Sequence, residues 1–287
     1  MPGPAPSELD AIRRAAAPRL DRLREEIAAC GSALVAFSGG VDSTFVLAVA
    51  REVLGDAAVA LTAHSPSVPA SEREEARELA KRLGARHVVR ESREGEDPRY
   101  RANPVDRCYY CKSELFAICE EVARGEGLAA VLDGFNADDR ADHRPGRRAG
   151  LERGVRSPLA DVGLGKAEIR AFSEAMGLPT WDKPQMACLA SRIPHGTEVT
   201  PERLARVERA EAGLRSLGFR ELRVRHHGDL GRVELGEAEL AEGFRREADV
   251  TAAVVAAGFT RAVLDREPYR SGRLNALAGV ALPVIAP

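Results

Sequence analysis

The sequence lacks the long apolar runs and the charge imbalance that mark membrane proteins and nucleic-acid-binding proteins. None of its apolar runs approaches the roughly 20 residues of a membrane-spanning helix. The opening residues, MPGPAP, lack the apolar centre of a signal peptide. The net charge of −2 gives no general attraction to nucleic acid or to an anionic membrane. We therefore expect a cytoplasmic protein that has neither a membrane nor a nucleic acid as its partner.

Cysteine is also scarce, with five residues in a chain of 287. That number does not make the disulfide framework of a secreted protein, and in the cytosol a paired spacing of cysteines indicates metal, cluster or redox chemistry. Apolar residues make up 44% of the chain and charged residues 30%, a mixture typical of a globular protein with a large core. The length predicts roughly two domains.

Strands and helices alternate along the first two thirds of the chain. The predicted strands are 33–37, 57–63, 86–90 and 129–132, and the predicted helices between and after them are 44–54, 71–83, 112–124 and 166–176. This alternation indicates an α/β fold with a doubly wound parallel sheet, whose ligands bind at the carboxyl ends of the strands. The later pattern predicts a smaller α+β domain, with helices at 200–217 and 238–257 and strands at 222–226, 232–235 and 261–265. We place the domains at 1–195 and 196–287.

A glycine-rich turn, SGGVDS at residues 38–43, joins the first predicted strand to the helix that follows. Its glycines let backbone N–H groups approach an anion, and the helix dipole favours negative charge there. No lysine follows the glycines, so the turn is not a Walker A loop. The string resembles the PP-loop of ATP pyrophosphatases, which cleave ATP between the α and β phosphates. The resemblance implies that Asp42 helps to bind Mg²⁺ and that pyrophosphate is held by Ser38, Gly39, Gly40 and Ser43. The alternative is an ordinary turn between a strand and a helix.

Three cysteines form the second pattern. Cys108 and Cys111 make a C-x-x-C just ahead of a predicted helix, and Cys188 lies in a distant segment. Three thiolates can hold a [4Fe–4S] cluster and leave one iron open for a further ligand. A redox pair or half of a zinc site are the alternatives, and zinc would need a fourth ligand. We interpret Cys30 and Cys119 as small buried residues, because both lie in helical, partly apolar runs.

Four strings together, SGGVDS, NPVDRCYYCK, LDGFNADD and WDKPQMACLASRIPHG, resemble the LarE-type sulfur-inserting enzymes of nickel-pincer nucleotide biosynthesis. The resemblance covers about residues 10–270. It implies that ATP adenylates a carboxylate of a pyridinium biscarboxylate mononucleotide and releases pyrophosphate. A sulfur nucleophile then displaces AMP and leaves a thiocarboxylate.

The resemblance is compatible with two alternative sources of the sulfur. In one branch the cysteine matching Cys188 gives up its own sulfur and becomes dehydroalanine. In the other, three cysteines hold a [4Fe–4S] cluster whose open iron carries a transferable sulfide. Because Cys108 and Cys111 accompany Cys188, the chain resembles the cluster branch, which needs a sulfide donor. The resemblance also implies a homo-oligomer, with a hexamer as one candidate form, and a second domain that binds substrate or mediates oligomerisation.

Further site residues follow from the fold and the resemblance. We expect the end of the second strand, at Ala63, to lie near adenine, and Gly134 to lie near the ribose and α-phosphate. Asp138 or Asp139 would bind the metal or orient the nucleotide. The predicted catalytic residues are Cys188, Asp42 and Arg192. Candidates for the substrate's phosphate and carboxylates are Arg192, Arg223 and Arg225; the last two point to one face of a strand. The alternative is that these are surface arginines of an arginine-rich chain.

Three other functions compete with this interpretation. A tRNA-thiolating PP-loop enzyme can also use three cysteines, but it is expected to show a basic surface or zinc-ribbon arms. An ATP-dependent amide synthase would need a source of ammonia. A nucleotide-sensing module would leave Asp42 and the cysteines without a role. The arginine-rich stretch 140–156 is interpreted as a solvated active-site loop rather than as an RNA-binding patch.

Overall fold

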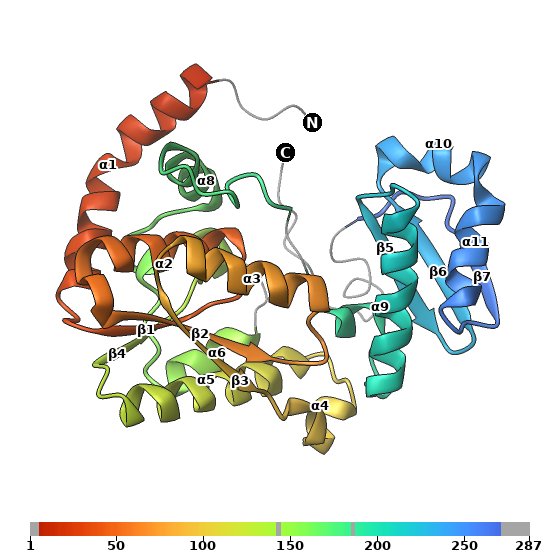
Figure 1. Cartoon of the computed structure of the whole chain (residues 1–287), viewed down its shortest axis with the longest axis horizontal. Helices are drawn as coiled ribbons and strands as arrows, with labels where there is room; N and C mark the ends of the chain where they lie inside the picture. The colour runs from red at the N-terminus through yellow and green to blue at the C-terminus, as the bar shows by residue number, and fades with distance from the viewer. Residues whose placement is uncertain (1–5, 142–144, 185–186, 271–287) are drawn as a thin grey trace. The chain divides into compact units, whose positions relative to one another are not determined.

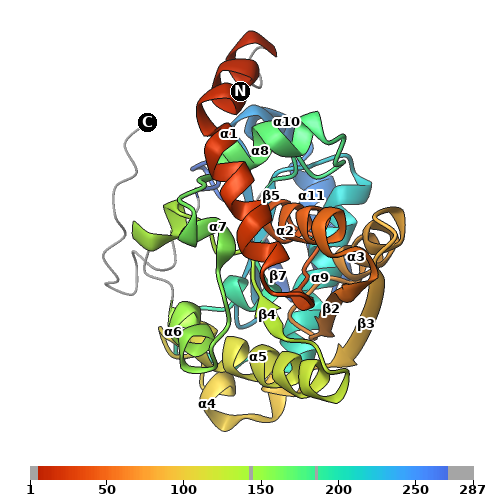
Figure 2. The ribbon, with the colours of Figure 1, turned by 90° about the vertical axis from the view of Figure 1, so that its left-hand side faces the viewer.

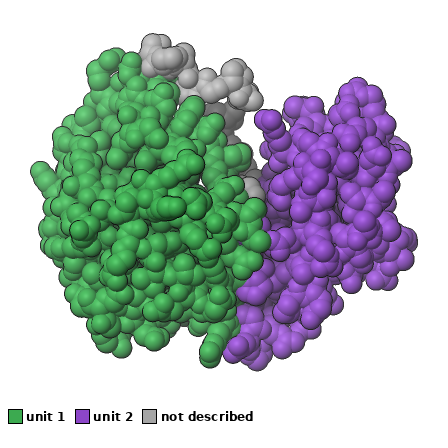
Figure 3. All heavy atoms as spheres, in the orientation of Figure 1, with its two compact units in different colours: residues 1–65, 70–94, 108–186 green, residues 66–69, 95–107, 187–287 purple. Residues whose placement is uncertain are grey.

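A computed structural model describes residues 6–141, 145–184 and 187–270 of the chain (Figure 1). Its contacts divide the chain into two units, which are described one at a time (Figure 3). Unit 1 comprises residues 1–65, 70–94 and 108–186, and unit 2 comprises residues 66–69, 95–107 and 187–287. Within the described ranges, no helix combines the length and the apolar character needed to cross a bilayer. The domain boundary at residue 195 stays a prediction.

Unit 1 is built on a parallel sheet of four strands in the order β3-β2-β1-β4. These strands are β1 (Ala33–Ala36), β2 (Ala58–His64), β3 (Arg86–Glu91) and β4 (Ala130–Leu132). Each neighbouring pair is parallel, and β1 lies between β2 and β4. The central strand β1 is a run of four apolar residues, as expected of a strand covered on both faces. The prediction of a doubly wound α/β fold is confirmed.

Helices cover both faces of this sheet (Figures 1 and 2). Alternate residues of β1 and β2 point to opposite sides, because the side chains of a strand alternate. Ala33, Val35 and Ala60 join a core with α1 (Pro6–Ala28), α2 (Val41–Leu54), α3 (Ala70–Arg82) and α8 (Lys166–Ala175). Leu34, Val59 and Leu61 pack on the other face against Cys119, Val122 and Ala123 of α5 (Arg107–Gly125). The carboxyl ends of the strands therefore open between two helical layers.

Helix α5 starts earlier than the sequence predicts. It begins at Arg107 rather than near residue 112, so the C-x-x-C forms its first turn instead of preceding it. The chain reaches this start through Asn103, which adopts a left-handed φ of 54°, and through a turn in which the Arg107 N–H bonds the Pro104 carbonyl. Since residues three apart are neighbours on a helix, Cys108 and Cys111 lie on one face of the first turn.

The arginine-rich stretch is also more ordered than the predicted loop. Among its described residues, α6 (Pro145–Glu152) is a helix, and a short helix α7 (Pro158–Asp161) follows. The Arg147 guanidinium lies 4.3 Å from the ring centre of Phe135, and that of Arg148 lies 4.0 Å from the ring centre of Tyr109. The Arg148 contact holds α6 on the helix that carries the C-x-x-C, and the Arg147 contact holds it on the segment after β4, so the interpretation as a solvated loop was wrong for this part.

Unit 2 contains a sheet of three strands in the order β5-β6-β7. Its strands are β5 (Leu222–His227), β6 (Leu230–Leu235) and β7 (Arg261–Leu264). The first two form an antiparallel hairpin, and β7 runs parallel to β6. The helices of this unit are α4 (Pro98–Arg101), α9 (Pro201–Ser216), α10 (Glu237–Arg245) and α11 (Glu247–Ala256). The predicted small α+β fold is present.

The helix predicted over 238–257 is two helices. Arg246 ends α10 with φ −111° and ψ 28°, outside the helical region, and α11 starts at the next residue. The side chain of Arg246 explains the break, because its Nη1 donates to the Leu217 carbonyl at 2.9 Å, where α9 ends. A tertiary contact of this kind leaves no mark in the local apolar pattern.

Candidate active site

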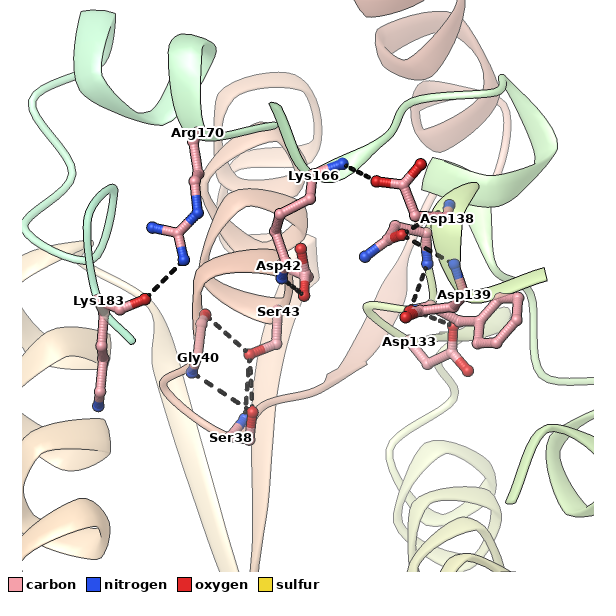
Figure 4. Close-up of polar contacts among 12 residues, drawn as sticks. Ser38, Gly40, Asp42, Ser43, Asp133, Asp138, Asp139, Lys166, Arg170 and Lys183 are labelled. Carbon is pink, nitrogen blue, oxygen red and sulfur yellow. Dashed lines mark hydrogen bonds and ion pairs between the residues drawn. The ribbon is translucent and has the colours of Figure 1, made fainter. Parts of the chain in front are cut away.

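The turn at residues 38–43 forms a closed loop between β1 and α2 (Figure 4). Gly39 has φ +71°, and Cα and Cβ of Ala76 lie 3.1 Å from the position of an added Cβ, so glycine is required here. The Ser43 hydroxyl closes the loop, with 3.1 Å to Ser38 Oγ and a 3.3 Å hydrogen bond to the Gly40 carbonyl. No side chain caps α2 at Gly40. Its first N–H groups are therefore available to an anion.

Gly134, which follows β4, packs directly on this loop. A Cβ at residue 134 would lie 2.8 Å from the backbone nitrogen of Ser43 and 3.2 Å from the carbonyl carbon of Asp42. Real Cβ atoms do not approach backbone so closely, so glycine lets the two segments meet. The structure thus brings together two of the regions that the sequence assigns to the nucleotide.

Lys166 contacts both Asp42 and Asp138, the first through its ammonium and the second through its backbone N–H (Figure 4). Asp42 Oδ2 accepts a hydrogen bond from Lys166 Nζ at 2.5 Å, and Asp42 Oδ1 is buried without a hydrogen-bond partner among the described residues. The backbone N–H of Lys166 donates to Asp138 Oδ2 at 2.7 Å. Carboxylate oxygens are the donors that Mg²⁺ prefers, and an orphaned buried oxygen is where such an ion would bind. The residues present therefore fit Mg²⁺.

The neighbouring residues Asp138 and Asp139 differ in their surroundings. Asp138 turns toward the start of α8, whereas the Asp139 carboxylate is buried and accepts the Asn136 backbone N–H at 3.2 Å. The side-chain oxygen of Asn136 in turn accepts hydrogen bonds from the backbone N–H groups of Asp138 and Asp139. This arrangement favours Asp138 for a role toward the metal and Asp139 for a role in holding the loop. Nearby, burial raises the pKa of the Asp133 carboxyl.

Lys183 joins the loop from the other side, and sequence reasoning missed it (Figure 4). Its Nζ lies 2.7 Å from a carboxylate oxygen of both Glu72 and Glu75 and 3.4 Å from the Gly39 carbonyl. Burial acts to lower the pKa of Lys183, but the two carboxylates outweigh it and raise that pKa. Arg170 donates to the carbonyls of Trp181 and Lys183 and fixes the same segment.

The end of β2 carries Ala63, the predicted adenine neighbour, which is half-buried. Just beyond it, the buried carboxylate of Glu94 accepts hydrogen bonds from the hydroxyls of Ser65 and Ser92. Sequence reasoning missed Glu94, because a glutamate in a short polar stretch gives no sign that it will be buried. The arrangement fixes the polar groups at the carboxyl ends of β2 and β3.

In unit 2, Cys188 is half-buried and immediately precedes the short 3₁₀ helix Leu189–Arg192. The Arg107 guanidinium lies 4.0 Å from its sulfur and also donates to the Ala190 carbonyl at 3.0 Å. This buried arginine was missed by sequence reasoning. One guanidinium thus contacts both the Cys188 sulfur and the backbone that follows it. Cys108, which is exposed, and Cys111, which is half-buried, belong to unit 1.

The three predicted substrate arginines are all buried within unit 2, so they are not surface residues. Arg192 forms a two-point ion pair with both carboxylate oxygens of Glu211. Arg225 contacts one carboxylate oxygen of Glu234, Oε2, through Nε and Nη2. Arg223 has a different environment: its Nη1 donates to the Leu222 carbonyl, and its guanidinium lies over the ring of Tyr269. Burial and then the positive charge of Arg192 lower the pKa of Arg223.

Comparisons with known proteins agree with this geometry. Residues 23–142 match the family model described as asparagine synthase. The chain is 39% identical over 242 residues to pyridinium-3,5-bisthiocarboxylic acid mononucleotide synthase of Lactiplantibacillus plantarum, which covers 84% of this chain and 88% of that protein. It is 45% identical over 260 residues to an uncharacterized protein of Synechocystis sp., covering 90% and 97%. A probable tRNA sulfurtransferase of Methanobrevibacter smithii is 30% identical over 118 residues, only 29% of that protein.

Proposed function

This chain belongs to the LarE-type family of ATP-dependent sulfurtransferases, and we propose on that basis that it inserts sulfur into a pyridinium biscarboxylate mononucleotide. A carboxylate oxygen of the substrate attacks the α-phosphorus of ATP, and the bond to the bridging oxygen breaks as pyrophosphate leaves. A sulfide nucleophile then attacks the acyl carbon, the bond to the AMP oxygen breaks, and a thiocarboxylate and AMP result.

The observation that carries the proposal is the relationship to the synthase. The match spans 242 residues and 88% of that protein, so it cannot lie within unit 1 alone. A match confined to the nucleotide-binding part would support ATP use and nothing more. The probable tRNA sulfurtransferase, of which 29% is matched, illustrates that narrower likeness.

In unit 1, the loop and the start of α2 would hold the β and γ phosphates. The left-handed Gly39 and the uncapped first turn present N–H groups to oxyanions, and the hydroxyls of Ser38 and Ser43 add donors. Asp42 and Asp138 would hold Mg²⁺, which neutralises phosphate charge when bound. Gly134 lets the segment after β4 pack on the same helix start, where the ribose and α-phosphate would lie.

In unit 2, the arginines would bind the oxyanions of the substrate. Glu211 pairs with Arg192 and also with Arg215, and Glu234 pairs with Arg225, so among the described residues the guanidiniums of this cluster outnumber its carboxylates. Arg223 has no carboxylate partner among the described residues, and its lowered pKa reports the cost of burying it beside like charges. A phosphate or carboxylate would relieve that cost, because guanidinium binds such groups at two points.

For sulfur delivery, the donor set fits a [4Fe–4S] cluster. Cys108 and Cys111 lie one turn apart, Cys188 supplies the third thiolate, and soft thiolates are the ligands that such clusters take. A bound cluster with one open iron would supply a transferable sulfide. Arg107 would hold the Cys188 sulfur and the Ala190 carbonyl in place. In either unit as described, no three His, Cys, Asp or Glu side chains gather as a metal site.

Release of pyrophosphate and AMP tests the function. We expect both from ATP only when the pyridinium biscarboxylate mononucleotide and a sulfide source are present, and we expect Asp42→Asn to abolish both. Release with tRNA in place of the mononucleotide, or an amide product in the presence of ammonia, would instead support one of the competing functions.

Iron content tests the sulfur source. After anaerobic reconstitution we expect about four irons per chain, lost in Cys108→Ala, Cys111→Ala and Cys188→Ala alike. Absence of iron from every preparation, together with loss of one sulfur atom from the intact mass of the chain after reaction, would identify Cys188 as a sacrificial donor.

A further inference from the structure

Lys166 stands at an unusual place for a lysine. It is the first residue of α8, where the positive end of the helix dipole disfavours a cation. Its ammonium reaches across to Asp42, a residue 124 positions away in the sequence (Figure 4). The side chains of Lys166 and Asp42 are 34% and 21% exposed. The pair is therefore only partly screened by solvent, and the helix start itself does not favour a lysine at this position.

The start of α8 is nevertheless fixed from several directions. The Lys166 backbone N–H donates to Asp138, and an added Cβ at Gly165 would lie 2.8 Å from Asp138 Oδ1. The Gly165 N–H donates to Glu168, whose other carboxylate oxygen pairs with Arg19 at 2.6 Å. These contacts fix the backbone from which the lysine extends, and the side chain itself is held by Asp42.

We propose that Lys166 is a phosphate-binding residue that changes partner when ATP binds. Without nucleotide, its ammonium neutralises Asp42 through Oδ2, next to the unpartnered Oδ1 at which a divalent cation would bind. When the metal–nucleotide complex binds, Asp42 takes the cation, and Lys166 turns to a phosphate oxygen. The like charge of the cation repels the ammonium, and the triphosphate attracts it. This role rests on the proposed ATP-dependent function, and it links metal binding to nucleotide binding.

The other lysine at the loop has different partners. Lys183 contacts two carboxylates and a backbone carbonyl at once, so moving its ammonium would break three contacts. Lys166 has one side-chain contact in the described structure, to Asp42. The cost of changing partner is therefore lower at Lys166, and the orphaned Oδ1 of Asp42 marks where the incoming cation would bind.

Two binding measurements on the whole chain test the proposal. Binding of Mn²⁺ is followed by electron paramagnetic resonance without nucleotide, and binding of ATP with Mg²⁺ is followed by calorimetry. In Lys166→Met we expect Mn²⁺ to bind several-fold tighter and ATP to bind roughly tenfold weaker or more. Lys166→Arg should restore most of the ATP affinity. Lys81→Met, which removes an exposed lysine of α3, is the matched control and should change neither affinity.

The direction of the two changes decides the outcome. A purely structural role would weaken both affinities together or leave both unchanged, and either result would overturn the proposal. Only opposite changes support it. If the wild-type chain fails to bind ATP, the proposed function itself is wrong. If the wild type binds ATP and Lys166→Met binds it equally well, only the role of Lys166 is wrong.

Discussion

Arg192 and Glu211 form a two-point ion pair in unit 2 with both side chains fully buried. Arg192 Nε lies 2.8 Å from Oε1 of Glu211, and Nη2 lies 3.1 Å from Oε2. Burial acts to raise the pKa of Glu211, but the charge and hydrogen bonds of Arg192 outweigh it and lower that pKa. Arg192 Nη1 also donates to the carbonyl oxygens of Ala187 and Cys188. The pair therefore fixes the segment that carries the candidate sulfur residue.

Breaking this ion pair should lower the unfolding free energy of the chain by a large amount. Either Arg192→Met or Glu211→Gln leaves a buried group without its partner, which we expect to cost about 3–5 kcal/mol of unfolding free energy. Denaturant unfolding measures this cost. The control is Arg101→Met, which breaks the pair with Glu198 that is 47% exposed on both sides and should cost about 1 kcal/mol or less. An equal loss of unfolding free energy at both sites would contradict the conclusion that the buried Arg192–Glu211 pair stabilises the fold.

His226 should make stability depend on pH. It is buried on β5 against Phe259, and neither ring nitrogen has a hydrogen-bond partner among the described residues. Burial, followed by the charges of Arg203 and Arg206, lowers its pKa below 6.5. The unfolded chain then binds a proton more readily than the folded chain. Stability is full above pH 6.5 and falls as the pH drops from there through the lowered folded-state pKa.

His226→Phe tests that dependence. The substitution removes two buried polar atoms, so we expect it to raise the unfolding free energy at pH 6 by about 1 kcal/mol or more. Thermal or urea unfolding from pH 8 to pH 5 should show a flatter profile for the variant than for the wild type. Parallel profiles would show that His226 does not titrate differently on unfolding.

Arg107 should control the reactivity of Cys188. Removing its guanidinium in Arg107→Met takes a positive charge from 4.0 Å away from the sulfur, so alkylation of Cys188 by iodoacetamide should slow several-fold. Peptide mass spectrometry of the metal-free, reduced chain measures every cysteine in one sample. Cys119 is the internal reference, because burial raises the pKa of its thiol to about 12 and it should stay unmodified in the folded chain. An unchanged alkylation rate at Cys188 would show that Arg107 does not influence the reactivity of this cysteine.

Gly134→Ala should weaken nucleotide binding. The added Cβ would lie 2.8 Å from the Ser43 backbone nitrogen, so the start of α2 must shift, at a cost of about 1–3 kcal/mol. Calorimetry with ATP and Mg²⁺ should show a clear loss of affinity. Gly125→Ala is the control, since nothing lies within 4 Å of its added Cβ. If both variants bind ATP like the wild type, the packing of residue 134 on the loop does not matter for the nucleotide.

The sequence predicts the parts of this molecule that depend on local pattern. An apolar strand, a glycine turn and a helix are sufficient to predict the phosphate loop and the parallel sheet around it, because each signal is contained in a few neighbouring residues. The early start of α5 was missed because the turn at Asn103 gives that residue a left-handed conformation without a glycine. The break at Arg246 was missed because its cause lies 29 residues away.

The roles of Lys166, Lys183 and Arg107 could not be predicted in the same way. Each depends on a partner more than 80 residues away in the sequence, and a lone lysine or arginine carries no sign of such a partner. One signal was present: Lys166 begins a predicted helix, where a cation is disfavoured. For Arg192, the sequence marks the motif but not the burial that makes this arginine a positioning residue as well as a candidate substrate ligand.

The most direct test of the account is the mass of the product. The chain is incubated with ATP, Mg²⁺, a sulfide source and the pyridinium biscarboxylate mononucleotide, and the nucleotide products are measured by mass spectrometry. We predict a product in which sulfur replaces one carboxylate oxygen, with one AMP and one pyrophosphate formed for each sulfur inserted. ATP cleavage without any sulfur-containing nucleotide product would contradict the proposed function.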